Sequence, residues 1–380
     1  MAAIDESIVA LFVLFQVQPS SRDQCKKNGK AVRLTIVTQS TARAESHDMK
    51  VFGHQWSVAS LSLCTLVLLP LLLVCDIGAA ERKKPVLIGA LTDSWGPTPG
   101  VVGLRDGLKE LGYREDQDFV IGVRFTQGNI AALPQAAREL VEQGADILFT
   151  NNPAPAKAAQ MATNRIPIVF YGAGDPIGLG LIKSFARPGG NLTGITDLDL
   201  ELDSKRLEIF KEMIPGLTRV LFPYDKAEAF SVAQAKIYRE SARRVKIMLI
   251  EKAVVTQAEA QATFDSIKTN EVHGIVVPRS LSFNIPGLAL EATSRQRIPT
   301  MFFGAWYVEQ GGLASYGPNF YESGRQAARL VDKILKGTSP REIPVEVNNN
   351  IEFVVNLKVA TKLGIKIVPQ ALYRATQVIR

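Results

Sequence analysis

Short apolar runs alternate with amphipathic stretches along the chain from residue 85 onward. The run VLIGALT at 86–92 predicts a buried strand, and the next stretch places Val101, Leu104, Leu108 and Leu111 on one helical face. Similar apolar runs predict strands at 119–126, 145–152, 166–171, 219–225, 246–254, 274–280 and 298–305. Uninterrupted apolar runs are typical of parallel strands, which are buried on both faces. The pattern therefore predicts an α/β protein with parallel sheets between helices.

The alternation occurs twice, which predicts two similar α/β halves of about 110 residues each. Ligands of doubly wound sheets bind beyond the carboxyl ends of the strands, so two facing halves would form a cleft between those ends. Polar and aromatic residues gather there, although each of them alone could also be an ordinary loop residue. The candidate solute contacts are Ser94, Trp95, Asn152, Asp175, Tyr224, Arg279 and Trp306.

These candidates suit the parts of an amino acid or a similar small polar solute. Asp175 or Asp225 could face an ammonium group, and Arg279 could face a carboxylate, as could donors near Ser94 and Asn152. The aromatic candidates could form a wall for an apolar side chain. Arg279 would suit any anionic solute.

The stretch IPIVFYGAGDPIGLGLI at 166–182 raises a competing interpretation, because glycine-rich turns after strands often hold phosphate. Asp175 places a negative charge in this turn, and Pro176 lacks the N–H group that a phosphate site would use. We therefore interpret the stretch as a strand end beside the cleft. Asp175 either faces the solute or holds its own loop.

Catalytic motifs are missing from the sequence. The first strand is not followed by a helix that opens with GxGxxG, and the chain contains no GxxxxGK[ST], GxSxG or HExxH. All three cysteines precede residue 80, and His273 is the one histidine beyond it, just before a strand and therefore at the end opposite the cleft. We expect no enzyme, no catalytic residues, no cofactor and no metal site.

The charge of the chain does not indicate a nucleic-acid partner. Its 44 Lys and Arg and 37 Asp and Glu give a net charge of +7, and the basic residues are scattered. Nucleic-acid binding proteins instead gather such residues on one face.

An apolar segment precedes the α/β region. Residues 51–75 contain no Asp, Glu, Lys or Arg, follow Met49-Lys50 and lead to small residues at 78–80. This order is typical of a secretory signal peptide, which we place at 49–80, although a membrane anchor is the alternative. Residues 1–48 are expected to be either untranslated, with Met49 as the true start, or a disordered extension. The expected location is periplasmic or otherwise extracytoplasmic.

Six segments in order carry a resemblance: GLKELGY, PIVFYGAGDPIGLGLI, ARPGGNLTGITDL, KRLEIFKEMIPG, EQGGLASYGPN and NLKVATKLGIKI. The chain from 85 to 380 resembles the substrate-binding proteins of a bacterial ABC-transporter family. This resemblance implies the type I periplasmic-binding-protein fold: two doubly wound, Rossmann-like domains joined by a three-strand hinge. It places domain 1 at 85–195 with 312–342, and domain 2 at 196–311 with 343–380.

The resemblance also implies a function and partners. A monomeric receptor would bind a small solute, possibly an amino acid, close around it and deliver it to an ABC permease in the cytoplasmic membrane. PRSLSF at 278–283 stands where relatives have a more acidic pattern, so the solute itself does not follow from the family. The alternative is the same module tethered by the apolar segment as the ligand-sensing domain of a signalling system.

Overall fold

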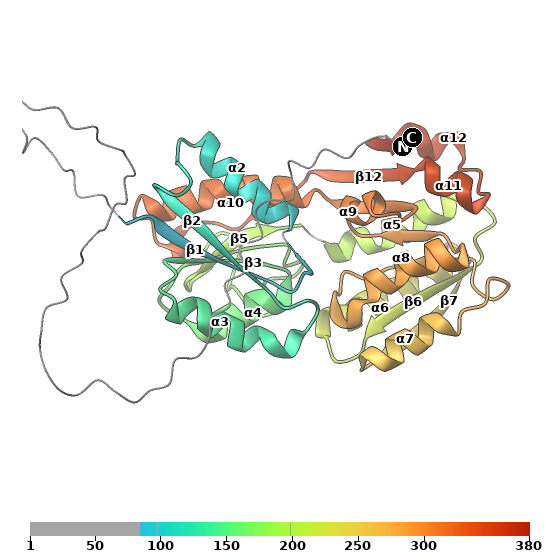
Figure 1. The fold of residues 1–380 in the computed structure, drawn as a ribbon, viewed down its shortest axis with the longest axis horizontal. Coiled ribbons are helices and arrows are strands. Elements are labelled where there is room, and N and C mark those ends of the chain that lie inside the picture. The colour runs from blue at the N-terminus through green and yellow to red at the C-terminus, as the bar shows by residue number, and fades with distance from the viewer. Residues whose placement is uncertain (1–83, 97, 198) are drawn as a thin grey trace, which may run out of the picture. The chain divides into compact units, whose positions relative to one another are not determined.

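The computed structural model describes residues 84–96, 98–197 and 199–380 (Figure 1). The predictions made for residues 1–48 and 49–80 lie outside this part of the chain. Within it, no helix is both long enough and apolar enough to cross a membrane.

The first sheet has the strand order β11-β5-β4-β3-β1-β2, and its strands pair in parallel. Its strands are β1 (Val86–Thr92), β2 (Phe119–Phe125), β3 (Ile147–Asn151), β4 (Ile168–Tyr171), β5 (Leu192–Thr196) and β11 (Glu346–Val347). One face packs against α2 (Pro99–Glu110) and α10 (Phe320–Leu335), and the other against α3 (Leu133–Glu142) and α4 (Pro153–Ala162). We call this sheet and its helices lobe 1.

The second sheet has the order β13-β12-β10-β9-β8-β6-β7 and is parallel except between β10 and β12. Its strands are β6 (Arg219–Asp225), β7 (Met248–Val254), β8 (Gly274–Val276), β9 (Thr300–Phe302), β10 (Ala314–Pro318), β12 (Ile351–Asn356) and β13 (Gln377–Ile379). Its helices are α5 (Asp199–Met213), α6 (Ala229–Arg244), α7 (Gln257–Asp265), α8 (Ile285–Gln296), α9 (Ala305–Glu309), α11 (Leu357–Leu363) and α12 (Pro369–Arg374). Together they form lobe 2.

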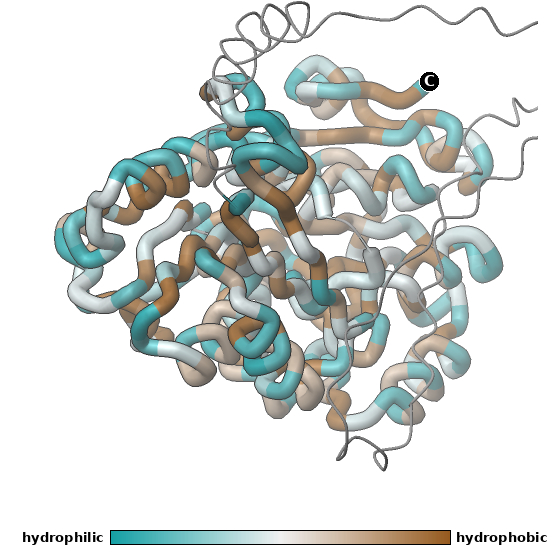
Figure 2. The backbone as a smooth tube through the Cα atoms, turned by 60° about the vertical axis from the view of Figure 1, so that its left-hand side comes forward, coloured by the Kyte–Doolittle hydropathy of each residue, from teal (hydrophilic) through white to brown (hydrophobic). Residues whose placement is uncertain are grey.

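Three short 3-10 turns complete the described elements: η2 (Ile130–Ala132), η3 (Ser282–Asn284) and η4 (Pro340–Glu342). Two lobe 2 helices, α5 and α6, share one apolar cluster with the sheet, while α7 and α8 share another. Each sheet is therefore covered on both faces, as the apolar runs predict. Figure 2 shows that hydrophobic and hydrophilic segments alternate along the chain, as expected for helices with one buried face.

The local predictions match the structure in most places. Strands β3, β4 and β5 are buried along their whole length, and Val101, Leu104 and Leu108 pack into the core from α2. Leu111 does not, because α2 ends at Glu110 and leaves that side chain exposed. No helix was predicted at α8, although its buried residues Ile285, Leu288, Ala289 and Ala292 follow helical spacing.

The predicted division at residue 312 is wrong for one strand. β10 pairs with β9 and β12 and so lies in lobe 2, and the chain returns to lobe 1 only with α10. The predicted division at residue 343 is also early, because β11 pairs with β5 of lobe 1. A strand forms backbone hydrogen bonds with whichever sheet edge lies beside it in the fold. The hydrophobic pattern of the sequence does not show which of the two sheets that is.

The sheets repeat one topology, and this topology positions the site. In lobe 1 the order β2-β1-β3-β4-β5 reverses direction between β1 and β3, and in lobe 2 the order β7-β6-β8-β9-β10 reverses between β6 and β8. Binding crevices form outside the carboxyl ends of the strands at such reversal points. Asn151 ends β3, and Arg279 lies in the segment after β8.

Candidate functional site

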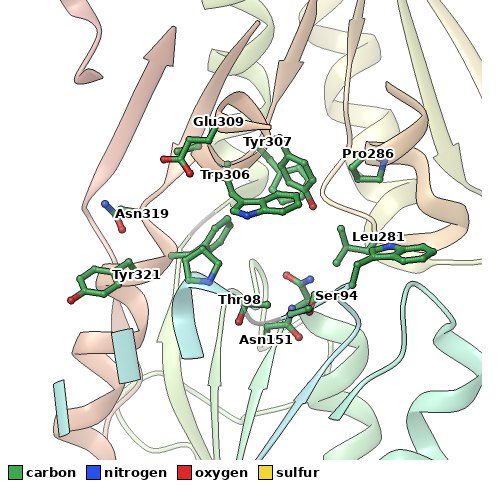
Figure 3. A pocket seen from close by; sticks show the side chains of 18 of the residues that line it. Ser94, Thr98, Asn151, Leu281, Pro286, Trp306, Tyr307, Glu309, Asn319 and Tyr321 are labelled. Carbon is green, nitrogen blue, oxygen red and sulfur yellow. The ribbon is translucent and has the colours of Figure 1, made fainter. Parts of the chain in front are cut away.

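A cavity of about 660 Å³ lies between segments that follow strands of both lobes (Figure 3). Lobe 1 contributes the segment after β1, the end of β3, Tyr171 of β4 and the start of α10. Lobe 2 contributes the segment after β8, the start of α8, and the stretch from Phe303 through α9. This volume is ordinary for a small-molecule site, and most of such walls are apolar.

Four of the seven candidate contacts lie in the wall of this cavity: Ser94, Trp95, Asn152 and Trp306. Trp95 comes from lobe 1 and is 52% exposed, and Trp306 comes from lobe 2 and is 46% exposed. Their rings could cover a flat or apolar part of a solute.

Arg279 is not part of the cavity wall. Its Nη1 donates to Oδ2 of Asp197 at 2.5 Å, and its Nε donates to Oδ1 of Asn152 at 3.1 Å. The guanidinium carbon also lies 4.7 Å from the centre of the Phe320 ring. Both charged side chains of the ion pair are almost completely buried. Arg279 of lobe 2 therefore binds residues of lobe 1 and of the segment that leaves β5.

The glycine-rich stretch at 166–182 makes room for this arginine. A Cβ atom at Gly172 would lie 2.0 Å from Nη2 of Arg279, and the φ of Gly172 is +72°. A side chain is therefore excluded by space and disfavoured by backbone conformation. The first of the clustered glycines thus accommodates a guanidinium from the other lobe.

A second close approach between the lobes occurs at Gly128. A Cβ atom there would lie 2.6 Å from the carbonyl oxygen of Leu281, and the φ of Gly128 is +75°. Leu281 belongs to the segment after β8, which also carries Arg279. The lobes therefore meet closely on this side of the cavity.

Asp93 directly follows β1 and orients the amides of Asn151, which ends β3, and of Asn152, which follows it. Its Oδ1 accepts hydrogen bonds from Nδ2 of Asn151 and from Nδ2 of Asn152, each at 3.0 Å. Burial raises the pKa of Asp93, and the two amides and the charge of Arg279 oppose that shift. Because both NH₂ groups donate to Asp93, neither amide oxygen is directed at that carboxylate. The amide oxygen of Asn152 accepts from Arg279, and that of Asn151 has no partner among the described residues.

Three candidates, Asp175, Tyr224 and Arg279, lie outside the cavity wall. Oδ1 of Asp175 accepts from the backbone N–H of Gly178 at 2.8 Å, which is the loop-holding alternative. Tyr224 stacks on Phe222 at 5.7 Å within the core of lobe 2. Arg279 joins the lobes as described above.

His273 lies far from the strand ends that form the cavity. Its Nδ1 is 2.8 Å from the hydroxyl of Thr218, and its Nε2 is 2.8 Å from Nη2 of Arg219. Burial and the charge of Arg219 lower the pKa of this imidazole. His273 therefore packs before β8, at the end where the sequence places it.

Several cavity residues were not identified from the sequence. They include Thr98, Tyr171, Phe303, Tyr307, Glu309, Asn319, Phe320, Tyr321 and Glu352. Asn319, Phe320 and Tyr321 directly follow β10, so the rule of strand ends could have found them. Glu352 comes from the start of β12, and the antiparallel pairing with β10 places that start beside the carboxyl end of β10.

Glu352 and Glu309 place two carboxylates in the cavity wall (Figure 3 labels Glu309). Nδ2 of Asn319 donates to Oε2 of Glu352 at 3.1 Å. Burial raises the pKa of Glu352 to about 7, with a smaller contribution from the charge of Glu309, while a hydrogen bond from the backbone of Ala305 opposes the shift. With a pKa of about 7, the carboxyl of Glu352 is partly protonated at neutral pH.

The described residues contain no group of three or more His, Cys, Asp or Glu side chains that could hold a metal ion. A two-lobed α/β fold with an aromatic cavity between the lobes defines the class of type I periplasmic binding proteins, which are non-enzymatic solute binders. Residues 85–379 match the model of the ABC transporter substrate binding protein family, and the chain belongs to that family.

Individual relatives agree with this assignment. A conserved domain protein from Vibrio cholerae O1 biovar eltor has 30% identity and a TM-score of 0.70, covering 78% of this chain and 100% of its own. The ABC domain from Streptococcus pneumonia, solved in complex with L-Trp, has 28% identity and a TM-score of 0.69 with the same coverage. A tyrosine-binding protein from Clostridioides difficile (strain R20291) is 25% identical over 278 residues, 73% of this chain and 80% of that protein.

Proposed function

We propose that the protein is the extracytoplasmic solute receptor of an ABC importer, and that it delivers a small polar solute to a membrane permease. The observation that carries this proposal is the cavity of about 660 Å³ whose walls come from both lobes. A solute there would contact both lobes at once and would therefore favour the conformation in which they meet.

An amino acid with an aromatic side chain is the first solute to test. Trp95 and Trp306 offer exposed rings from opposite lobes. One relative was solved with L-Trp, and another is a tyrosine-binding protein. The candidate contacts within the cavity are Ser94, Trp95, Asn152 and Trp306, to which we add Thr98 and Tyr307.

We also propose that the two lobes are hinged domains in a monomeric receptor. The described chain passes between the sheets after β5, between β10 and α10, and between β11 and β12. Three neighbouring connections would allow the two lobes to rotate relative to each other while limiting their sideways displacement. Small-angle scattering with and without solute tests this hinge, since closure reduces the radius of gyration.

A thermal-shift screen tests the function itself. The purified protein would be heated with amino acids, amines, nucleosides, sugars and small carboxylates. A solute at one hundred times its dissociation constant stabilises the folded state by about 2.7 kcal/mol. Turnover of a compound without a stabilising solute would contradict the proposal and favour an enzyme.

The location of the protein is proposed from residues 49–80. Cleavage after Ala79 or Ala80 would release a soluble periplasmic receptor, whereas a retained apolar segment would give the tethered sensor. N-terminal sequencing of the protein from its own cells distinguishes these results.

A further inference from the structure

The charged side chains that line the cavity have one sign. Among the described residues of its wall, Glu309 and Glu352 are the acidic side chains, Glu352 with a pKa raised to about 7, and none is Lys, Arg or His. A solute with a free negative charge would therefore meet two carboxylates and no basic partner. The opposite holds for an ammonium or guanidinium group, which could form charge-assisted hydrogen bonds with them.

The nearest arginine at the strand ends does not reverse this balance. Arg279 lies outside the wall, and its charge is matched by Asp197 at 2.5 Å in a buried ion pair. It also packs against the ring of Phe320, whose side chain stands in the wall. Withdrawing the guanidinium to reach a solute carboxylate would leave Asp197 with a buried charge, which is costly.

Helix starts beside the cavity also offer few backbone donors. Anions often bind to free N–H groups at a helix N-terminus. Here Pro99 begins α2, Pro153 begins α4, and Pro286 is the second residue of α8, and proline has no N–H group. The N–H group of Ala305, which begins α9, already bonds Glu352.

An independent observation concerns Asn151, which is only 5% exposed and lies in the cavity wall (Figure 3). Its Nδ2 donates to Asp93, so its Oδ1 is left as an acceptor, and no described residue donates to it. A buried acceptor without a partner is costly, and this oxygen is shielded from solvent, so a donor from a solute would satisfy it only after the side chain turns toward the cavity. Primary ammonium and guanidinium groups carry several donors and no acceptor.

We infer that the solute carries a positively charged amino or guanidino group, which binds at Glu309 and Glu352, on a body flat enough to contact Trp95 and Trp306. Solutes whose only charge is negative are excluded from this cavity. The inference rests on the proposed function, because it names the charge class of the solute for the same site. It differs from the sequence-based expectation, in which Arg279 could receive an anion.

Charge-matched ligands test the inference. Titration calorimetry on the purified protein would compare tryptamine, L-tryptophan and indole-3-propionate, then tyramine, L-tyrosine and 3-(4-hydroxyphenyl)propionate, then butylamine, 4-aminobutyrate and butyrate. In the set that binds, the amine (tryptamine, tyramine or butylamine) should bind at least tenfold more tightly than the compound whose only charge is a carboxylate (indole-3-propionate, 3-(4-hydroxyphenyl)propionate or butyrate). Equal or tighter binding of the carboxylate would overturn the inference.

Variants assign the charge to its residues. E309Q and E352Q should each weaken binding of the amine about tenfold, and E346Q should not, because Glu346 lies on β11 outside the cavity wall. Unchanged binding in both cavity variants would overturn the assignment even if the amine binds. Binding of a neutral sugar or nucleoside in place of every amine would overturn the inference and leave the proposed function intact. An absence of binding by any compound in the broad screen would overturn both.

Discussion

Arg279 and Asp197 form a buried ion pair that connects lobe 2 to the segment leaving β5, with 2.5 Å between Nη1 and Oδ2. Breaking such a pair by removing one partner leaves a buried charge without compensation and typically costs about 3–5 kcal/mol. We therefore expect Arg279→Met to lower the free energy of unfolding by that order. Urea denaturation of the variant and the parent protein measures the loss.

The control for this variant is an ion pair on the surface. Arg239 and Glu251 also form a close pair, but their side chains are 44% and 26% exposed. Exposed pairs contribute about 0–1 kcal/mol, so Arg239→Met should have a small effect. Comparable losses in the two variants would show that the Arg279 pair has no special role.

Gly172→Ala should disturb the same contact from the lobe 1 side. Its Cβ would lie 2.0 Å from Nη2 of Arg279, so the arginine would have to move away from Asp197. We expect a lower unfolding free energy than the positive φ alone explains, and weaker solute binding. Urea denaturation and calorimetry measure these two effects.

Gly112 provides the matched control. Its φ is +92°, and a Cβ there would meet no atom within 4 Å. Gly112→Ala therefore reports the backbone cost alone, which is about 1–2 kcal/mol. A loss in Gly172→Ala no larger than in Gly112→Ala would contradict the steric role of Arg279.

These contacts mark how far the sequence allows the site to be predicted. Apolar runs at β1, β3 and β4 identify strands because both faces of a parallel sheet are buried, and the rule of strand ends then leads to Ser94, Trp95 and Asn152. The same rule includes Arg279, yet it cannot say whether a polar side chain faces a solute or a partner in the protein. Whether Arg279 faces a solute or the protein depends on Asp197, which follows β5, and on Gly172, which follows β4.

Glu352 shows a second reason why the sequence pattern did not predict the whole site. It is the second residue of β12, which pairs antiparallel with β10, so the start of β12 lies beside the carboxyl end of β10 at the cavity. Its role depends on Asn319 and Ala305, both distant in sequence. Pairing between remote segments determines such positions, and a local hydrophobic pattern does not contain it.

Glu352 should also make stability depend on pH. Its pKa rises from the ordinary 4.5 to about 7 in the folded protein, so the folded state holds this proton more tightly than the unfolded state. Stability must then fall as pH rises from about 4.5 to about 7 and remain level above that range, as far as this group is concerned. We expect the melting temperature of E352Q to decline less over this range than that of the parent protein.

Glu228 has to be separated from this effect, because burial raises its pKa to about 7 as well. E228Q should reduce the same decline independently, and the double variant should reduce it further. Melting curves at several pH values between 4 and 8 provide the comparison. Parallel profiles for E352Q and the parent protein would show that the carboxyl of Glu352 does not have a raised pKa.

A second buried ion pair stabilises lobe 2 beneath the site. Arg206 binds Asp203, and its Nε donates to the carbonyl oxygen of Tyr316 in β10 at 2.7 Å. Asp203 also accepts from Nε2 of Gln234, whose Oε1 accepts from the backbone N–H of Arg279 at 3.2 Å. The pair therefore supports both β10 and the segment that carries Arg279.

Arg206→Met should lower the unfolding free energy by about 3–5 kcal/mol, because Asp203 would keep its charge in the core without its main partner. Adding Asp203→Leu should recover part of this loss, since the double variant no longer buries a lone carboxylate. The two single variants and the double variant form a cycle whose coupling energy is read from urea denaturation. Additive losses would mean that the two side chains do not stabilise each other.

The exposed rings of Trp95 and Trp306 give the last prediction. If a solute lies between them, each Trp→Ala substitution removes contact area from the complex, and we expect the dissociation constant to rise at least tenfold for either variant. Neither ring is needed for the core, because about half of each remains exposed, so the melting temperature without solute should change little. Tyr373→Ala is the matched control, since that ring is 92% exposed and lies outside the cavity wall. Unchanged affinity in both Trp variants would place the solute elsewhere in the protein.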